Sequence, residues 1–193
     1  MIKEKFFPTI IYAKDVKLNN NQLITDILNW SKQDKGVEKT NYKGWHSTTD
    51  MANKPEYQQL VTELMRMQHE IYEEEHLDRY AKIGNMWANI NPPGSMNHPH
   101  IHPNALFSGV YYVRSQPKCG RLKIYDPRPG VQHSMPIRKP GNPGKDLWRE
   151  AYIDPIPGRI IMFPSWLWHS VEENTSTDIR ISVSFNFIQN GFQ

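Results

Sequence analysis

Three histidines lie close together in the segment NHPHIHP, at His98, His100 and His102. Because side chains alternate between the two faces of an extended chain, this spacing projects all three to one face. Two such imidazoles can hold one metal ion, and a mononuclear non-haem iron site needs a third ligand that leaves positions open for substrate and oxygen. His169, which follows the apolar segment RIIMFPSWLW, is the best candidate for that ligand, and we expect it to lie on an opposing strand.

The polar face of the segment RISVSFNFI carries a second group that could do chemistry. Alternation along this predicted strand places four apolar side chains on the core face, namely Ile181, Val183, Phe185 and Phe187. The other face, which looks into a polar cavity or solvent, carries Arg180, Ser182, Ser184 and Asn186. A guanidinium holds a carboxylate with two parallel charge-assisted hydrogen bonds. Arg180, with Ser182 pointing the same way, therefore predicts a binding site for a dicarboxylate.

These residues resemble the 2-oxoglutarate and Fe(II) oxygenase superfamily, whose pattern is an HxD pair, a distant histidine and an arginine shortly beyond it. Upstream, Asn89, Asn91 and Gly94 are similar to the N-x-[Y/N]-x-x-G segment that helps AlkB-type members bind 2-oxoglutarate. The resemblance implies that the protein uses Fe(II), 2-oxoglutarate and O2. It also implies that Arg180, Ser182, Asn89 and Asn91 contact 2-oxoglutarate.

Longer segments are similar to a small family of 2-oxoglutarate oxygenases found in bacteria and in phages of marine cyanobacteria. The similar segments cover nearly the whole chain and are FFPTIIYA, GWHS, HIHPNALFSGVYYV, YDPRP, PGRIIMFPSWLWHSV and RISVSFNF. The resemblance implies a dioxygenase that hydroxylates a peptide side chain or a small molecule and releases succinate and CO2. Because adjacent strand residues point to opposite faces, only one of Tyr111 and Tyr112 can line the site, and we expect Tyr111 to do so.

The chain departs from the superfamily at the carboxylate of HxD, where it has His102. Three neutral histidines would leave the ion with its full +2 charge, which still attracts a dianionic co-substrate. The favoured ligands are His100, His102 and His169. Two alternatives remain, a His98 and His100 pair or a carboxylate from Asp126 in YDPRP.

Composition limits the classes of function open to the protein. The 193 residues fit a single domain, residues 1–193, and the formal charge of +3 gives no strong signal for nucleic acid. With Cys119 as the single cysteine, neither a disulfide framework nor a cysteine-rich zinc module can form. We expect a soluble protein of the cytoplasm, or of the host cytoplasm if a phage encodes it, because no segment reads as a signal peptide or a membrane span.

Periodicity predicts the elements that must position these residues. Residues 6–13 read as an edge strand that could pair across a homodimer, and residues 19–32 and 55–75 read as amphipathic helices. After residue 83 the chain consists of short β-rich runs separated by Pro and Gly. We therefore expect a mainly β (α+β) fold, a double-stranded β-helix or jelly roll of about eight strands over residues 83–193. Supporting helices would occupy residues 1–82, and the Pro- and Gly-rich residues 127–149 would form a lid.

Two rival functions follow from the same residues. A cupin-type metal enzyme that does not use 2-oxoglutarate is favoured by the missing carboxylate and disfavoured by Arg180. A jelly roll that only binds a sugar or a peptide would show weak metal affinity and no oxygen-dependent turnover of 2-oxoglutarate. The identity of the substrate cannot be predicted beyond a small molecule or a peptide.

Overall fold

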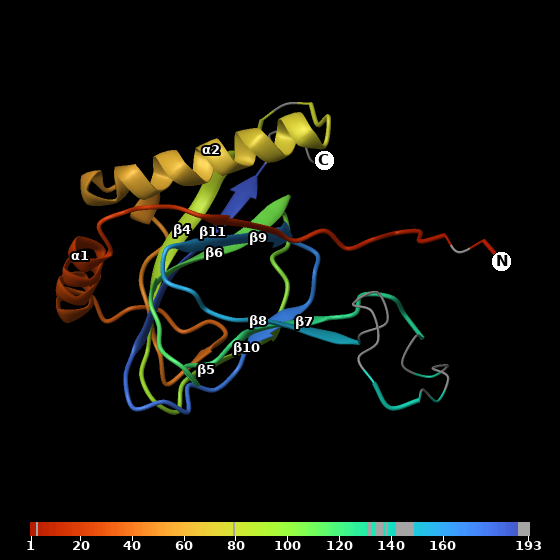
Figure 1. Ribbon diagram of the computed structural model, residues 1–193. Helices are drawn as coiled ribbons and strands as arrows, with labels where there is room; N and C mark the ends of the chain where they lie inside the picture. The colour runs from red at the N-terminus through yellow and green to blue at the C-terminus, as the bar shows by residue number, and fades with distance from the viewer. Residues whose placement is uncertain are drawn as a thin grey trace.

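Two antiparallel sheets face each other, and the helices cover the outer face of the larger one (Figure 1). The computed structural model describes residues 1–2, 4–78, 80–130, 133, 137, 139–141 and 149–188. The strands of the larger sheet are, in spatial order, β1 (Tyr12–Asp15), β9 (Arg159–Pro164), β6 (Phe107–Arg114), β11 (Arg180–Ile188), β4 (Lys82–Asn91) and β3 (Trp45–His46). The strands of the smaller sheet are β2 (Asn41–Tyr42), β5 (Met96–His100), β10 (His169–Val171), β7 (Leu122–Tyr125) and β8 (Glu150–Ile153).

The helices support the larger sheet from outside. Helix α1 (Asn20–Gln33) begins where the Asn19 side chain accepts a hydrogen bond from the backbone of Gln22 at 3.2 Å. Short 3-10 turns at Met51–Asn53 and Pro55–Tyr57 lead into α2 (Gln58–Glu74). Neither helix among the described residues combines the length and the apolar composition that crossing a bilayer requires.

The larger core lies between these helices and the sheet. The buried stripe of α2 consists of Leu60, Leu64, Met67 and Ile71, spaced three or four residues apart. It shares one cluster with the β11 side chains Ile181, Val183, Phe185 and Phe187, as strand alternation predicts. The other face of β11 is therefore directed into the space between the two sheets, where the polar side chains of that strand line a cavity.

The mainly β, double-stranded β-helix class is confirmed, and both helices lie where periodicity places them. Edge strand β1 begins later than residues 6–13, because it pairs with β9 only from Tyr12 onward. The predicted count of about eight strands over residues 83–193 is confirmed, since β4 to β11 are eight strands. The two-residue strands β2 and β3, which precede them, were not predicted. The predicted lid, residues 127–149, lies largely outside the described residues.

Candidate metal and carboxylate site

His100, His102 and His169 come together at one end of the smaller sheet. His100 is the last residue of β5, His102 lies two residues beyond it, and His169 is the first residue of β10. Strands β5 and β10 are neighbours, and His100 is directly opposite His169 in their register. The expectation that His169 lies on an opposing strand is therefore confirmed, and that strand belongs to the same sheet as His100. The spacing of 69 residues between His100 and His169 indicates only that they lie on two separate strands. The hydrogen bonds between β5 and β10 bring these strands together in one sheet.

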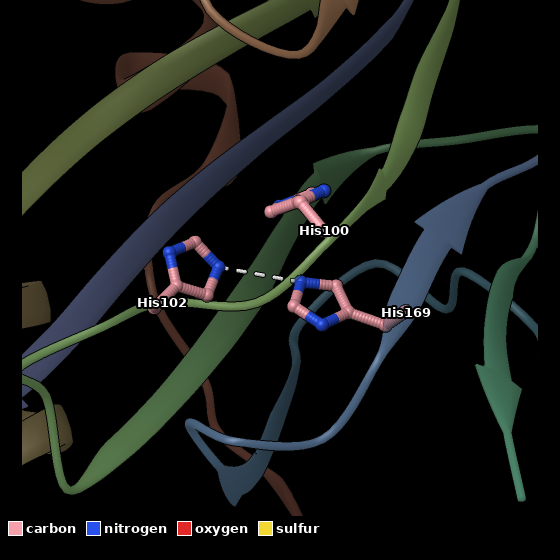
Figure 2. Close-up of side chains that lie close together, drawn as sticks. All are labelled: His100, His102 and His169. Carbon is pink, nitrogen blue, oxygen red and sulfur yellow. Dashed lines mark hydrogen bonds between the residues drawn. The ribbon is translucent and has the colours of Figure 1, made fainter. Parts of the chain in front are cut away.

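The three imidazoles are close enough to share one ion (Figure 2). One nitrogen of each ring lies within 4.8 Å of the others. The Nε2 atoms of His102 and His169 are 3.3 Å apart, close to the roughly 3 Å expected for two nitrogens bound in adjacent positions at about 2.1 Å from one metal. Among the residues that the structure describes, this is the one group of three or more His, Cys, Asp or Glu side chains with such spacing.

Backbone carbonyls fix the orientation of two of these rings. The Nδ1 atom of His100 lies 2.7 Å from the carbonyl oxygen of His98, and Nδ1 of His169 lies 2.8 Å from that of Leu167. A carbonyl can only accept, so Nδ1 carries the proton in both rings. Their Nε2 lone pairs are then free to bind a metal, as in the usual arrangement of histidine ligands and their outer partners.

Burial keeps the cluster uncharged at neutral pH. Desolvation lowers the pKa of His102 to about 3, and the positive charge that His169 and His100 would carry lowers it further in the same direction. Desolvation, followed by the charge of His100, lowers the pKa of His169 to about 4. The pKa of His100 is lowered as well, again mainly by burial. Neutral imidazoles with free lone pairs are the form that binds a metal.

The metal-free protein is expected to lose stability as pH falls from about 6.5 towards 4. The folded-state pKa values of His102 and His169 lie below the ordinary value of 6.5, so the unfolded chain binds more protons in this window. Thermal unfolding of His102→Gln should show a shallower decline with falling pH than the wild type. His98→Gln, an exposed histidine outside the cluster, should keep the wild-type slope. Identical slopes for all three proteins would contradict these pKa values.

A cavity of about 300 Å³ joins the cluster to the polar face of β11. The three histidines open into it, together with Arg180 and Ser182. Asn89, which is directly opposite Ser182 in the register of β4 and β11, also lines the cavity and donates a hydrogen bond to Ser184 at 3.0 Å. The predicted ligands and the predicted carboxylate-binding residues thus open into one space.

Arg180 is the most deeply buried charge in this cavity wall, with 2% of its surface exposed. Its Nη1 atom donates to the carbonyl oxygens of Cys119 and Gly120, at 3.0 and 2.9 Å. Its Nε atom is buried without a hydrogen-bond partner, and no carboxylate among the described residues pairs with the guanidinium. A buried cation without an anionic partner is costly. The position therefore favours an anionic ligand.

The chain near Arg180 is shaped to make this contact. Gly120 has a φ of +89°, and a Cβ atom there would lie 2.2 Å from the carbonyl oxygen of Glu172 and 2.9 Å from Nη1 of Arg180. Only glycine allows the carbonyl to approach the guanidinium in this way.

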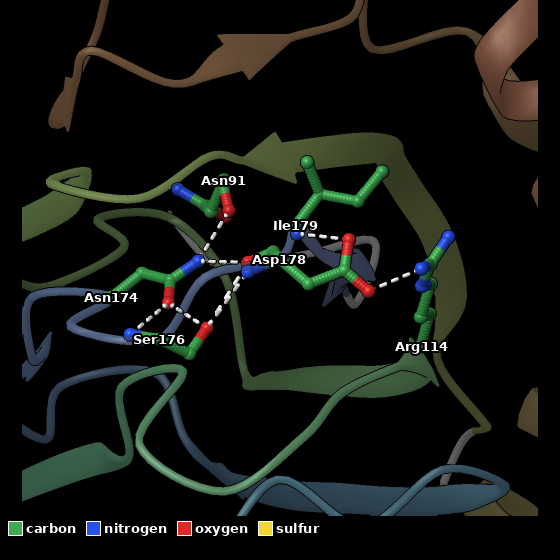
Figure 3. Close-up of polar contacts among 6 residues, drawn as sticks. All are labelled: Asn91, Arg114, Asn174, Ser176, Asp178 and Ile179. Carbon is green, nitrogen blue, oxygen red and sulfur yellow. Dashed lines mark hydrogen bonds and ion pairs between the residues drawn. The ribbon is translucent and has the colours of Figure 1, made fainter.

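The loop before Arg180 is held by a buried amide (Figure 3). The Asn174 side chain donates to the carbonyl oxygens of Asn91 and Asp178, both at 2.8 Å. The Asp178 carboxylate in turn pairs with Arg114 on β6. These bonds tie the loop to β4 and β6 and set the direction in which β11 begins. Asn91, predicted to contact the co-substrate, has this structural contact and does not line the cavity.

Tyr112 lines the cavity, and the expectation that Tyr111 does so is wrong. Tyr111 faces the helices and donates a hydrogen bond to the Asn20 side chain at 2.5 Å, which docks α1 onto the sheet. The segment FSGVYYV has no contrast between a polar and an apolar face, so the sequence does not reveal which tyrosine points inward. Pairing with β11 decides it, because Tyr112 lies directly opposite Ser182.

Neither alternative ligand joins the histidine cluster. His98 is exposed and packs its ring against Tyr42, with centroids 6.3 Å apart. Asp126 forms an ion pair with Arg128 at 2.7 Å and lies outside the cavity that contains the histidines. The expectation that all three histidines of NHPHIHP project to one face fails at His98. The pairing of β5 with β10 shifts register between Asn97 and His100, so regular alternation does not hold between His98 and His100 although both lie in β5.

Several solved structures have a similar fold. A prolyl-4-hydroxylase from Pseudomonas putida has a TM-score of 0.68 and 16% identity, covering 95% of this chain and 94% of that chain. The epimerase SnoN from nogalamycin biosynthesis has a TM-score of 0.69 and 11% identity, covering 94% of this chain and 77% of that chain. HygX from Streptomyces hygroscopicus, solved with nickel and 2-oxoglutarate bound, has a TM-score of 0.66 and 9% identity, covering 96% of this chain and 85% of that chain.

The family is shown by a different comparison. None of the curated proteins matches the sequence. A family model with the description "Putative 2OG-Fe(II) oxygenase" matches residues 85–186, more than half of the chain. This range runs from β4 into β11 and includes the three clustered histidines and Arg180. The chain therefore belongs to this family of 2OG-Fe(II) oxygenases.

Proposed function

We propose that this protein binds Fe(II) through His100, His102 and His169 and binds 2-oxoglutarate through Arg180, and that it oxidises a second substrate with O2. The observation that carries the proposal is the buried guanidinium of Arg180, which has an unpartnered Nε and lines the same cavity as three neutral imidazoles. The cavity thus offers a metal-binding end and an anion-binding end. A dicarboxylate that chelates a metal needs both.

The residues present fit these groups. Imidazole suits iron, and three ligands leave coordination positions free. Arg180 and Ser182 would hold the carboxylate of 2-oxoglutarate that is remote from the metal, while Asn89 offers a polar contact beside them. When bound, Fe(II) and 2-oxoglutarate supply the oxidation by O2, with succinate and CO2 as products. The apolar side chains Phe163 and Leu122 line the cavity too and exclude water from it.

Asn186 is expected to orient His102. Its Nδ2 lies 3.5 Å from Nδ1 of His102 and 2.6 Å from Oδ1 of Asn85, and its Oδ1 accepts from Ser108 at 2.7 Å. Metal binding through Nε2 of His102 puts a proton on Nδ1. A half-turn of the Asn186 amide presents its oxygen to that proton, and a matching half-turn of the Asn85 amide lets its Nδ2 donate to the same oxygen.

Removing this acceptor should weaken metal binding roughly tenfold or more, as loss of an outer partner usually does. In a calorimetric titration with Mn(II), Asn186→Leu should show this loss, whereas Asn186→Asp keeps an acceptor and should bind nearly as the wild type does. Ser184→Ala, on the same face of β11, is the matched control. Unchanged affinity in a folded Asn186→Leu protein would contradict this role.

The substrate is proposed to be a peptide side chain or a small molecule. Similarity in fold to a prolyl-4-hydroxylase supports the first, and similarity to an epimerase of nogalamycin biosynthesis supports the second.

A cytoplasmic location is part of the proposal, because the single cysteine, Cys119, is buried and unpaired. A cupin-type enzyme without 2-oxoglutarate is the rival that the three-histidine ligand set favours.

Turnover of 2-oxoglutarate tests this proposal. Protein with Fe(II), 2-oxoglutarate, ascorbate and air should form succinate slowly even without its second substrate, and omission of Fe(II) or replacement by Mn(II) should stop it. Succinate formation that is independent of iron, or its absence in protein shown to bind both Fe(II) and 2-oxoglutarate, would count against an oxygenase. The second outcome would support a module that binds these molecules without catalysis.

A further inference from the structure

The charged side chains that line the cavity are all basic. Arg180 lies at its buried end and the exposed Lys39 lies at its mouth, and no described Asp or Glu contributes to the wall. The remaining polar groups are neutral amides, hydroxyls and imidazoles, among them Asn85, Asn97 and Thr40. A cavity of this kind favours anions over cations.

The bound co-substrate would not use up this positive charge. On the proposed function, on which this inference rests, the site contains a divalent ion, three neutral histidines and the Arg180 cation. A 2-oxoglutarate dianion leaves one positive charge unbalanced. A carboxylate at position 102 would have balanced it, but the chain has His102 there. An unbalanced charge that is partly buried is costly, so a further anion is favoured.

Lys39 is free to supply the second contact. Other lysines on the surface have carboxylate partners, as Lys14 has in Glu70 and Lys123 has in Glu150. No ion pair or side-chain hydrogen bond involves the ammonium group of Lys39 among the described residues. Lys39 and His46 both line the cavity, and the charge of Lys39 contributes to lowering the pKa of His46, after the larger effect of burial.

An aromatic wall connects Lys39 with the metal cluster. His46 stacks on Trp87, with ring centroids 5.2 Å apart and planes 10° apart. Trp87 lies 5.9 Å from the ring of His102. These three rings all line the cavity, from the side of Lys39 at the mouth to the histidine cluster. The wall offers a flat apolar surface to the part of a substrate that lies between an anionic group and the metal.

We propose that the primary substrate carries a carboxylate, which pairs with Lys39 at the cavity mouth while its carbon chain lies along His46 and Trp87. The carboxylate reduces the positive charge that the metal, Arg180 and Lys39 leave beside 2-oxoglutarate, and the chain directs a C–H bond towards the cluster. A free small acid and an acidic peptide side chain share this chemistry.

Two matched pairs of probes test the proposal. Butyrate and butyramide represent a free small molecule, and the N-acetyl N-methylamides of glutamate and glutamine represent a peptide side chain. Each is titrated calorimetrically into protein loaded with Mn(II) and saturated with 2-oxoglutarate. In at least one pair the acid should bind roughly fivefold or more tightly than its amide, as one partly exposed ion pair allows, and the pair that responds identifies the source. Added salt should reduce the difference.

Lys39→Gln should lose most of this preference, whereas Lys43→Gln should keep it. Lys43 is the control because it lies four residues away, packs over Tyr42 and does not line the cavity. Acids that bind no better than their amides, including no binding of any probe, would overturn the inference, as would a preference that survives in Lys39→Gln. If Mn(II) and 2-oxoglutarate themselves fail to bind, the proposed function fails as well, so the two failures are distinguishable.

Discussion

Replacing His169 by glutamine is expected to lower Fe(II) affinity by more than about 100-fold, because loss of an outer partner of a ligand alone costs 10 to 100-fold. His169 is buried, its Nδ1 is committed to the carbonyl of Leu167, and its Nε2 lies 3.3 Å from that of His102. No described Asp, Glu or Cys belongs to this ligand group and could take its place. Anaerobic titration with Fe(II), followed by measurement of bound iron, gives the affinity.

The control for His169→Gln is His98→Gln. His98 precedes His100 by two residues in the same sheet but packs on Tyr42, so its replacement should leave metal affinity within about twofold of the wild type, as for a surface change. Thermal unfolding without metal shows that each variant is folded. Loss of affinity in His98→Gln together with retention in His169→Gln would instead favour the His98 and His100 pair as ligands.

Replacing Arg180 by glutamine is expected to weaken 2-oxoglutarate binding by roughly 100-fold or more, since removing one partner of a buried charge pair costs about 3–5 kcal/mol. Metal affinity should stay near the wild-type value, because Arg180 lies on β11 and the histidines lie on and beside β5 and β10. Competition between 2-oxoglutarate and N-oxalylglycine on Mn(II)-loaded protein measures the effect.

Arg114→Gln is the matched control for Arg180→Gln. Arg114, like Arg180, is an arginine on a β-strand. It differs in that it forms an ion pair with Asp178 and does not line the cavity. Its loss should lower stability with little change in 2-oxoglutarate affinity. Equal loss of 2-oxoglutarate binding in both variants would mean that the shape of the loop before β11 matters more than the Arg180 charge.

The face of β11 could be predicted from the sequence because its apolar and polar residues alternate without exception over RISVSFNF. This alternation placed Phe185 in the core and Arg180 in the cavity, where the structure has them. The helices were predictable for the same reason, since their apolar positions repeat every three or four residues. The orientation of a helix or strand can thus be predicted from the sequence when its apolar and polar residues repeat regularly.

Other parts of the site depend on pairing that no local pattern encodes. Strand β10 has only three residues, so its place beside β5, and with it the position of His169, follows from the sheet and not from its own sequence. The alternate positions of the strand that carries Tyr111 and Tyr112 do not differ in polarity. The register with β11 therefore decides which tyrosine enters the cavity. The contact of Arg180 with the Cys119 and Gly120 carbonyls joins residues about 60 positions apart. The sequence around Arg180 does not predict this contact.

Anaerobic titration of Fe(II)-loaded protein with 2-oxoglutarate tests the central claim most directly. Bidentate chelation produces a weak visible charge-transfer band, which should appear and saturate in the wild type. In Arg180→Gln the band should need far more 2-oxoglutarate to develop, and His169→Gln should show none because it holds no iron. If no band forms in wild-type protein shown to contain Fe(II), 2-oxoglutarate is not a chelating co-substrate here. The three-histidine site would then belong to a metal enzyme of another kind.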